Sequence, residues 1–253
     1  MTINTSEARP KGLLGNDGKG VLVAFDHALG VGPSPGSEYP AATLEQIVEG
    51  GADGVLVSPG VRRRFADILD SRVKIILSIP TDPKYVEYAA SSGCAGVKTT
   101  FFGDVRDPAP FRMMEDVAIA CHSLGIQYLD EVVASEPRTT RAIRDDLLVQ
   151  LAARKAAELG ADVVKTSYSA TKEGFGRAVS TTFIPVVILG GEKADDVDLL
   201  QMTKDSVDAG GAGVAYGRNV WCRKNPKTMV QALRAIVHDG KTVRDALAIL
   251  DGT

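Results

Sequence analysis

The chain has 253 residues, a mass of 26.7 kDa and a formal net charge of −3, with 24% charged residues. The chain has no surplus of basic residues that would indicate nucleic-acid binding. No apolar run reaches the roughly 20 residues of a membrane helix. The N-terminus lacks the charged-then-apolar pattern of a signal peptide. We therefore expect a cytoplasmic protein with a small-molecule partner, and neither a nucleic-acid nor a membrane partner.

Short β-branched runs alternate with longer segments of helical period from Gly20 onward, which is typical of βαβ units around a parallel sheet. The regular spacing of these units favours a single (β/α)8 TIM barrel, because an open, doubly wound sheet rarely needs so uniform a spacing. We predict one catalytic domain over residues 1–253, with residues 1–19 as an N-terminal extension. The eight predicted strands are Val21–Phe25, Val55–Val57, Val73–Ile79, Gly96–Phe101, Gln127–Val132, Asp162–Thr166, Val186–Leu189 and Gly213–Tyr216.

The stretch GVGPSPGSEYP, from Gly30 to Pro40, follows the first predicted strand. It is too rich in glycine and proline for a helix, so a loop is predicted there. Loops that follow the strands of a barrel carry its active site. This loop is therefore a candidate lid or rim of the site.

The lysine of DVVKTSY, Lys165, lies in a buried β-branched run near the end of the predicted sixth strand. Desolvation there favours the neutral amine, which is the nucleophilic form of lysine. The alternative is a lysine that reaches solvent or pairs with a neighbouring carboxylate. Lys98 in GVKTT has almost the same register on the fourth strand. It is interpreted as a second cation that activates the nucleophile, or as a substrate ligand.

Carboxylates occur near the ends of two other predicted strands. Asp26 follows the apolar run VLVAF and is predicted to face the barrel mouth as an acid or base, so that its neighbour His27 faces the other way. The alternative is an aspartate that caps the loop through backbone contacts. Glu131 in YLDEVV is placed similarly on the fifth strand, with Asp130 on the opposite face, and the pattern leaves open by one residue which of the two faces inward. A structural ion pair to a lysine explains Glu131 equally well.

Glycines follow the last two predicted strands, as Gly190-Gly191 and Gly217-Arg218. Many barrels bind phosphate at this position through backbone N–H groups. Arg218 and Lys193 add positive charge, which favours a phosphorylated substrate. The alternative is two ordinary turns that use glycine for its conformational freedom.

The sequence holds three histidines, His27, His122 and His238, and no HExxH motif or paired histidines at metal spacing. It therefore predicts no metal site and argues against a metal-dependent aldolase mechanism. His122 and His238 lie in predicted helical segments and are interpreted as surface or packing residues. No GxGxxG opens the first βα turn, so no dinucleotide is indicated and no cofactor is expected.

At these residues the chain resembles the archaeal-type class I fructose-bisphosphate aldolase family, which includes related synthases and transaldolase-like biosynthetic enzymes. The similarity spans most of the chain, and its first, third and last segments together are the most specific. The similar segments are FDHALGVGP at 25–33, GADGVLVSPG at 51–60, DVVKTSY at 162–168, LGGEK at 189–193 and GVAYGRNVWCRKNP at 213–226.

The resemblance implies a homo-oligomeric class I aldolase with a Schiff-base lysine, an acid on the first strand and a phosphate cradle after the last two strands. These roles fall in turn on Lys165, on Asp26, and on Gly190, Gly191, Gly217 and Arg218.

The sequence departs from the family on the fifth strand, where the family has a proton-transferring tyrosine and this chain has Val133. Glu131, Tyr168 and His27 are the candidates to replace it. The departure argues against fructose 1,6-bisphosphate as the substrate and favours a different aldol acceptor.

The sequence thus predicts an aldolase or transaldolase-like synthase in which Lys165 forms an iminium with a ketose phosphate or dihydroxyacetone phosphate. Asp26 is expected to assist the carbinolamine steps, and Glu131 or a nearby group to transfer the substrate proton. The alternatives are a phosphosugar isomerase that uses a carboxylate base, and a barrel that binds a sugar phosphate without turnover.

Overall fold

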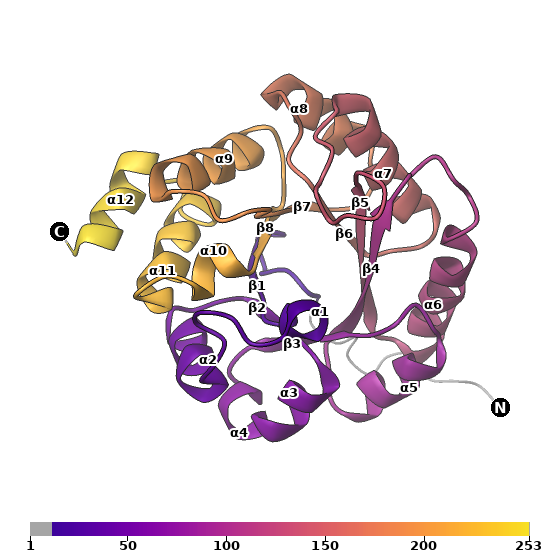
Figure 1. The fold of residues 1–253 in the computed structure, drawn as a ribbon, viewed down its shortest axis with the longest axis horizontal. Coiled ribbons are helices and arrows are strands. Elements are labelled where there is room, and N and C mark those ends of the chain that lie inside the picture. Colours follow the sequence, from indigo (N-terminus) through magenta and orange to yellow (C-terminus); the bar gives the residue numbers. More distant parts are fainter. Residues whose placement is uncertain (1–11, 253) are drawn as a thin grey trace.

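The computed structural model describes residues 12–252. Eight parallel strands pair in chain order, and β8 pairs with β1, so the sheet closes into a barrel (Figure 1). The predicted (β/α)8 barrel is confirmed. The strands are β1 (Gly20–Ala24), β2 (Gly54–Val57), β3 (Lys74–Ser78), β4 (Gly96–Gly103), β5 (Gln127–Ala134), β6 (Val163–Thr166), β7 (Val186–Leu189) and β8 (Gly213–Tyr216).

Helices form the outer layer around the strands (Figure 1). Several begin where a side chain accepts a backbone N–H of the first turn, as Asp145 does for α7 and Asp195 for α9. None of the helices within residues 12–252 is long and apolar enough to cross a membrane. The helices are α1 (Ala28–Val31), α2 (Pro40–Glu49), α3 (Pro59–Arg64), α4 (Ala66–Leu69), α5 (Lys84–Ser91), α6 (Phe111–Leu124), α7 (Asp146–Glu158), α8 (Lys172–Ser180), α9 (Asp196–Asp208), α10 (Arg218–Trp221), α11 (Pro226–Val237) and α12 (Val243–Asp251).

Apart from shifts of one residue at the ends of other strands, two details differ from the sequence-based expectation. Strands β4 and β5 continue two residues beyond their predicted ends, because they stay paired as far as Gly103 and Ala134. The predicted loop from Gly30 to Pro40 begins inside a single helical turn, α1, none of whose residues is buried. The rest of that stretch, up to Tyr39, is irregular as predicted.

The interior of the barrel is apolar in its lower part and polar near the C-terminal ends of the strands. Side chains alternate along a strand, so residues two positions apart face the same side. Ala24, Ile76, Leu129 and Val163 belong to the buried interior cluster. The residues two positions further along are polar in each case, namely Asp26, Ser78, Glu131 and Lys165.

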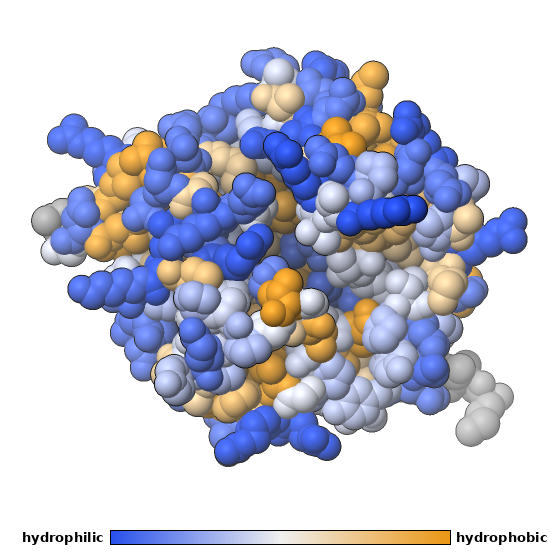
Figure 2. All heavy atoms as spheres, viewed as in Figure 1, coloured by the Kyte–Doolittle hydropathy of each residue, from blue (hydrophilic) through white to orange (hydrophobic). Residues whose placement is uncertain are grey.

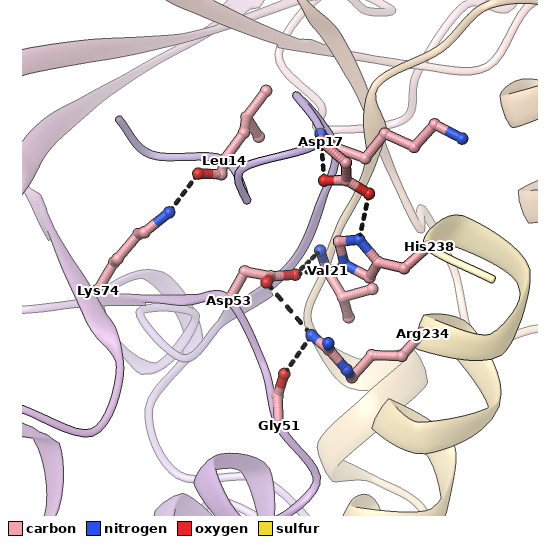
Figure 3. A network of polar contacts seen from close by, with 9 residues as sticks. Leu14, Asp17, Val21, Gly51, Asp53, Lys74, Arg234 and His238 are labelled. Carbon is pink, nitrogen blue, oxygen red and sulfur yellow. Dashed lines mark hydrogen bonds and ion pairs between the residues drawn. The ribbon is translucent and has the colours of Figure 1, made fainter. Parts of the chain in front are cut away.

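The N-terminal segment closes the bottom of the barrel. Leu13 is fully buried within the interior cluster, and its backbone N–H donates to Gln127 Oε1 at 2.6 Å. Lys74 Nζ donates to the carbonyl of Leu14 (Figure 3). The predicted extension therefore plugs the barrel from Gly12 onward, and its residues 1–11 lie outside the described residues.

A cluster of charges, which we call the bottom cluster (Asp17, Asp53, Arg234 and His238), holds this segment against α11 (Figure 3). His238 Nδ1 lies 2.8 Å from Asp17 Oδ2, and its Nε2 lies 2.8 Å from Asp53 Oδ2. Hydrogen bonds to the two aspartates raise the pKa of His238 against the opposing effect of burial. Burial opposes the charge of Asp53, but hydrogen bonds from His238 and Val21 outweigh it and lower the Asp53 pKa. His238 is thus a tertiary ion-pair partner, which goes beyond the packing role expected from sequence.

The bottom cluster predicts a pH-dependent contribution to stability. The two aspartates contribute above their unfolded pKa of about 4, and His238 contributes fully below about pH 6.5, its unfolded pKa. The histidine contribution is lost as the pH rises through its raised folded value. We expect His238→Gln to lower the free energy of unfolding by about 1–3 kcal/mol between about pH 4 and about pH 6.5, where both aspartates and the histidine are charged.

Urea unfolding at about pH 5.5 and about pH 8.5 measures this difference on both sides of the histidine titration. The loss should be clearly smaller at the higher pH. His122→Gln, which changes an exposed histidine on α6, is the matched control. An equal loss at both pH values would show that the charge of His238 does not stabilise the fold.

Candidate active site

Ionic side chains from four strand ends meet inside the mouth of the barrel. We call Asp26, Lys98, Glu131 and Lys165 the lysine–carboxylate network. Lys165 Nζ lies 2.7 Å from Glu131 Oε1, and Lys98 Nζ lies 3.1 Å from Glu131 Oε2. Lys98 Nζ also lies 2.6 Å from Asp26 Oδ2. Ammonium and carboxylate groups therefore alternate through the network, in the order Lys165, Glu131, Lys98 and Asp26.

The barrel geometry produces this order. Glu131 on β5 is the direct register partner of Lys165 on β6, and Lys98 lies on β4, the strand on the other side of β5. Asp26 lies two residues beyond the end of β1 and faces inward, as the alternation predicts. Because the strands are parallel, all four residues lie toward the same end of the barrel.

The side chains of the network are almost fully buried. The side chains of Lys98, Glu131 and Lys165 are 6–7% exposed and that of Asp26 is 10% exposed. Isolated charges at such depth are costly, whereas paired and hydrogen-bonded charges are tolerated. Two hydroxyls complete the hydrogen bonding, with Ser78 Oγ donating to Asp26 Oδ2 at 2.5 Å and Thr100 Oγ1 to Glu131 Oε2 at 3.1 Å.

Mutual attraction fixes the charges of the network. Burial opposes the charge of Asp26, but Lys98 and Lys165 outweigh it and lower its pKa to about 2. The same two lysines outweigh burial at Glu131 and lower its pKa. Burial also opposes the charge of Lys98, but Glu131 and Asp26 outweigh it and raise its pKa. At neutral pH both acids are carboxylates and Lys98 is an ammonium.

The contacts distinguish the two lysines. Lys98 is held between two carboxylates, whereas the ion pairs of Lys165 among the described residues involve Glu131 alone. A nucleophilic amine must first lose its proton, and Lys165 has one proton acceptor directly beside it. The geometry favours Lys165 as the nucleophile and Lys98 as a fixed cation.

Two residues proposed to replace the family's tyrosine lie outside the network. The ring of Tyr168 packs against Phe175 of α8, with centroids 5.1 Å apart, and so belongs to the outer core. The ring of His27 packs against Trp221 at 6.0 Å. Burial and the positive charge of Arg218 lower the His27 pKa, so the imidazole is neutral at pH 7. Glu131 is the one of the three that touches Lys165.

The neighbours of Glu131 on β5 have other surroundings. Asp130 faces outward, is fully buried and accepts a hydrogen bond from Thr99 Oγ1 at 2.9 Å. Its burial raises its pKa to about 7. Val133 lies two positions after Glu131 and is fully buried. The strand therefore presents an apolar side chain beyond Glu131, at the position where the resemblance implies a tyrosine.

The predicted phosphate residues come together in two adjacent loops. Arg218, after β8, donates to the carbonyl of Gly191, after β7, at 3.3 Å. Gly191 has φ of 62°, a left-handed conformation that favours glycine. A Cβ at Gly190 would lie 2.7 Å from Asn219 Nδ2, so no larger residue fits there without movement. Lys193 is exposed on the first of these loops.

Asn219 is a residue of this region that the sequence pattern does not reveal. It is 1% exposed, and its amide bonds to the carbonyls of Gly190 and Glu192. An asparagine in the sequence GRNVW carries no signal of burial. The contact depends on two loops that are joined only in the fold.

The mouth of the barrel opens on the face that carries α1 and α10. Figure 2 shows this face hollowed near its middle, with hydrophilic residues around much of the hollow and apolar residues gathered at α1. Exposed apolar side chains there include Leu29 and Val31. The rim next to the end of β1 is therefore partly apolar.

Comparisons with known proteins match this arrangement. The sequence model of the family described as "DeoC/LacD family aldolase" matches residues 20–223. The chain is 32% identical to 2-amino-3,7-dideoxy-D-threo-hept-6-ulosonate synthase of Halobacterium salinarum, over 93% of this chain and 92% of that protein. It is 28% identical to a class 1 fructose-bisphosphate aldolase of Halobacterium salinarum, over 92% of this chain and 96% of that protein.

A solved structure gives the same result in three dimensions. It is an archaeal fructose-1,6-bisphosphate aldolase with its catalytic lysine covalently bound to the carbinolamine intermediate of the substrate. The two chains are 26% identical, with a TM-score of 0.76 and coverage of 89% of this chain and 96% of that one. The family resemblance expected from the sequence is confirmed.

The network predicts how Asp26 responds to the loss of its cation. Lys98→Met keeps the length of the side chain and removes the charge, so that burial opposes the Asp26 carboxylate with only Lys165 nearby. We expect the pKa of Asp26 to rise from about 2 to above its ordinary value of 3.8. We also expect the free energy of unfolding to fall by about 3–5 kcal/mol, since removing one partner leaves buried charge uncompensated.

A carboxyl-carbon NMR titration measures this pKa, with Asp26→Asn identifying the resonance. Lys155→Met is the control. Lys155 lies on α7, outside the network, and its Nζ donates to the carbonyl of Val105 in the loop after β4. If Asp26 still titrated near its wild-type value in Lys98→Met, Lys98 would not be the cation that holds it.

Proposed function

This chain belongs to the DeoC/LacD family of aldolases, and we propose that it makes or breaks a carbon–carbon bond through a Schiff base on Lys165. One observation supports this most directly. Lys165 Nζ is buried at the mouth of the barrel, 2.7 Å from a carboxylate that can take and return its proton. The substrate we propose is a ketose phosphate or dihydroxyacetone phosphate, with an aldehyde as the acceptor.

Glu131 serves the first half of this mechanism. The Lys165 ammonium gives a proton to the Glu131 carboxylate, and the neutral amine adds to the substrate ketone to form a carbinolamine. The Glu131 acid then protonates the carbinolamine hydroxyl, which leaves as water. The product is an iminium on Lys165, and Glu131 is again a carboxylate. The electron pair of the nitrogen supplies the new C=N bond.

Asp26 serves the second half, the step at the carbon–carbon bond. It lies on the far side of Lys98 from Glu131, and its low pKa keeps it ionised as a proton acceptor. Asp26 takes the proton of the hydroxyl on the carbon beyond the scissile bond. That carbon becomes the aldehyde, and the bonding pair moves into the iminium to give an enamine. Bond formation is the reverse.

This division of roles differs from the one expected from sequence, which gave the carbinolamine steps to Asp26. The reason is distance, since Glu131 and not Asp26 contacts Lys165. Lys98 stays an ammonium throughout and holds the two carboxylates in place.

The phosphate of the substrate is proposed to bind at the loops after β7 and β8. Gly190, Gly191 and Gly217 offer backbone, and Arg218 and Lys193 offer positive charge. The apolar Val133 supports an aldol acceptor other than that of fructose 1,6-bisphosphate, in keeping with the similarity to a heptulosonate synthase. The homo-oligomeric state and the cytoplasmic location stay predictions.

Borohydride trapping tests the nucleophile. Wild type incubated with dihydroxyacetone phosphate or a panel of ketose phosphates, then reduced, should gain the mass of one reduced adduct. Lys165→Ala should gain none and lose activity, because the amine that forms the iminium is gone. Lys172→Ala, which changes a partly exposed lysine on α8, should trap like wild type. Intact mass measures the adduct, and circular dichroism checks the fold.

Two results would contradict the assignment. An adduct that survives Lys165→Ala but disappears in Lys98→Ala would identify Lys98 as the nucleophile. An unmodified wild type across the whole panel would remove the covalent mechanism and favour the isomerase or the non-covalent binding barrel.

A time-resolved version of this experiment should distinguish the roles of the two carboxylates. Glu131→Gln should slow adduct formation by about 10²–10⁴-fold, the usual value of general acid–base catalysis, because Lys165 loses its proton acceptor. Asp26→Asn should still form the adduct within about tenfold of the wild-type rate, but its turnover rate should fall by about 10²–10⁴-fold. Quenched-flow mass spectrometry and steady-state assays measure the two rates. The opposite pattern would restore the roles expected from sequence.

A further inference from the structure

We infer that Asn219 is the positioning residue that gives the proposed phosphate cradle its shape. The cradle is defined here as the backbone of residues 190–193 with the side chain of Arg218. The inference rests on the proposed function, because it specifies how that site is built. Asn219 itself is 1% exposed, so it acts through the loop and does not touch the ligand.

The Asn219 amide satisfies three backbone groups of the loop after β7. Its Nδ2 donates to the carbonyls of Gly190 and Glu192, each at 3.0 Å. Its Oδ1 accepts the backbone N–H of Ala194 at 3.0 Å. One side chain thus fixes the loop at its beginning, middle and end.

Side chains hold three carbonyls of the loop, with Gly190 and Glu192 bonded by Asn219 and Gly191 by Arg218. The carbonyls of Gly190 and Glu192 are turned onto Asn219, where they cannot repel an anion. Within residues 12–252, the backbone N–H groups of Gly191, Glu192 and Lys193 donate to no acceptor. Backbone N–H groups left free in this way are the donors that bind phosphate in proteins.

A second set of contacts holds Asn219 in place. The guanidinium of Arg223 donates to the carbonyl of Ala194 at 2.6 Å and to the carbonyl of Asn219 at 3.3 Å. It also pairs with Asp196 Oδ1 at 2.7 Å. The loop after β7 and the segment after β8 are therefore joined through both the side chain and the backbone of Asn219.

The chemistry of the amide is specific. An aliphatic side chain would leave two carbonyls and one N–H without partners. An aspartate would keep the acceptor for Ala194 but would place a carboxylate against the two carbonyls of Gly190 and Glu192. Only an amide of this length offers both donors and the acceptor.

Calorimetric titration with inorganic phosphate tests the inference without any turnover. We expect Asn219→Ala to weaken phosphate binding by about tenfold, which corresponds to about 1.4 kcal/mol. Asn219→Asp should weaken it at least as much while keeping the shape of the side chain. Asn225→Ala, which removes the cap of α11 at Thr228, is the matched control and should bind phosphate like wild type.

Steady-state kinetics separates positioning from a general loss of structure. For the donor found by trapping, Asn219→Ala should raise KM by about tenfold and change kcat by less than about threefold. For the same donor without its phosphate, KM should not change. A lower kcat or melting temperature with unchanged KM for both donors would show a merely structural role and overturn the inference.

Arg218→Ala distinguishes this inference from the proposed phosphate site. If Arg218→Ala weakens phosphate binding and both Asn219 variants do not, the role of Asn219 is wrong and the site stands. If wild type binds no phosphate, the proposed site is wrong and the inference fails with it. If Asn219→Ala does not fold, the Asn219→Asp variant decides the result.

Discussion

The pairing of two ammonium groups with two carboxylates inside the barrel is the constraint on which the site depends. Each buried ion costs several kcal/mol of desolvation, and only close, alternating partners offset that cost. The distances of 2.6–3.1 Å between Lys165, Glu131, Lys98 and Asp26 provide such partners. The four residues come from β4, β5, β6 and the end of β1, so the network forms only when the barrel closes. The environment of Lys165, the proposed nucleophile, is therefore a product of tertiary structure.

One end of the barrel stabilises the fold, and the other end carries the candidate active site. Below the network, the interior is filled by apolar side chains and is closed by Leu13. The bottom cluster around His238 fixes this plug with charges that are partly exposed, at a distance in sequence of 221 residues from Asp17. Water is thereby kept from the floor of the site, which strengthens the electrostatic interactions above it. The mouth lies at the opposite end, on the face that is hollowed near its middle in Figure 2.

The sequence predicts the fold and the facing of the key residues because both follow from local periodicity. Asp26 and Lys165 each lie two positions beyond an apolar interior residue, so alternation turns them inward. On the fifth strand the pattern leaves a choice between Asp130 and Glu131, which the structure decides for Glu131 through its contact with Lys165. The same rule excludes Tyr168, which lies three positions after Lys165 and hence on the outer face, where it packs on Phe175. Asn219 and His238 have no such local signal. Their partners lie in other loops, and only the closed fold brings them together.

The absence of a phenol at Val133 changes how protons can move in this chain. On β5 the carboxylate of Glu131 lies between two apolar side chains of the same face, Leu129 and Val133, both fully buried. A carboxylate bonded to two lysines can accept a proton from one of them and return it to the hydroxyl on the carbon that this nitrogen has attacked, without a second group. The neutral His27 near Arg218 lies close to the phosphate loops and not on β5. In the proposed mechanism, proton transfer at the iminium thus depends on the network itself, and the position where the resemblance implies a tyrosine holds the apolar Val133.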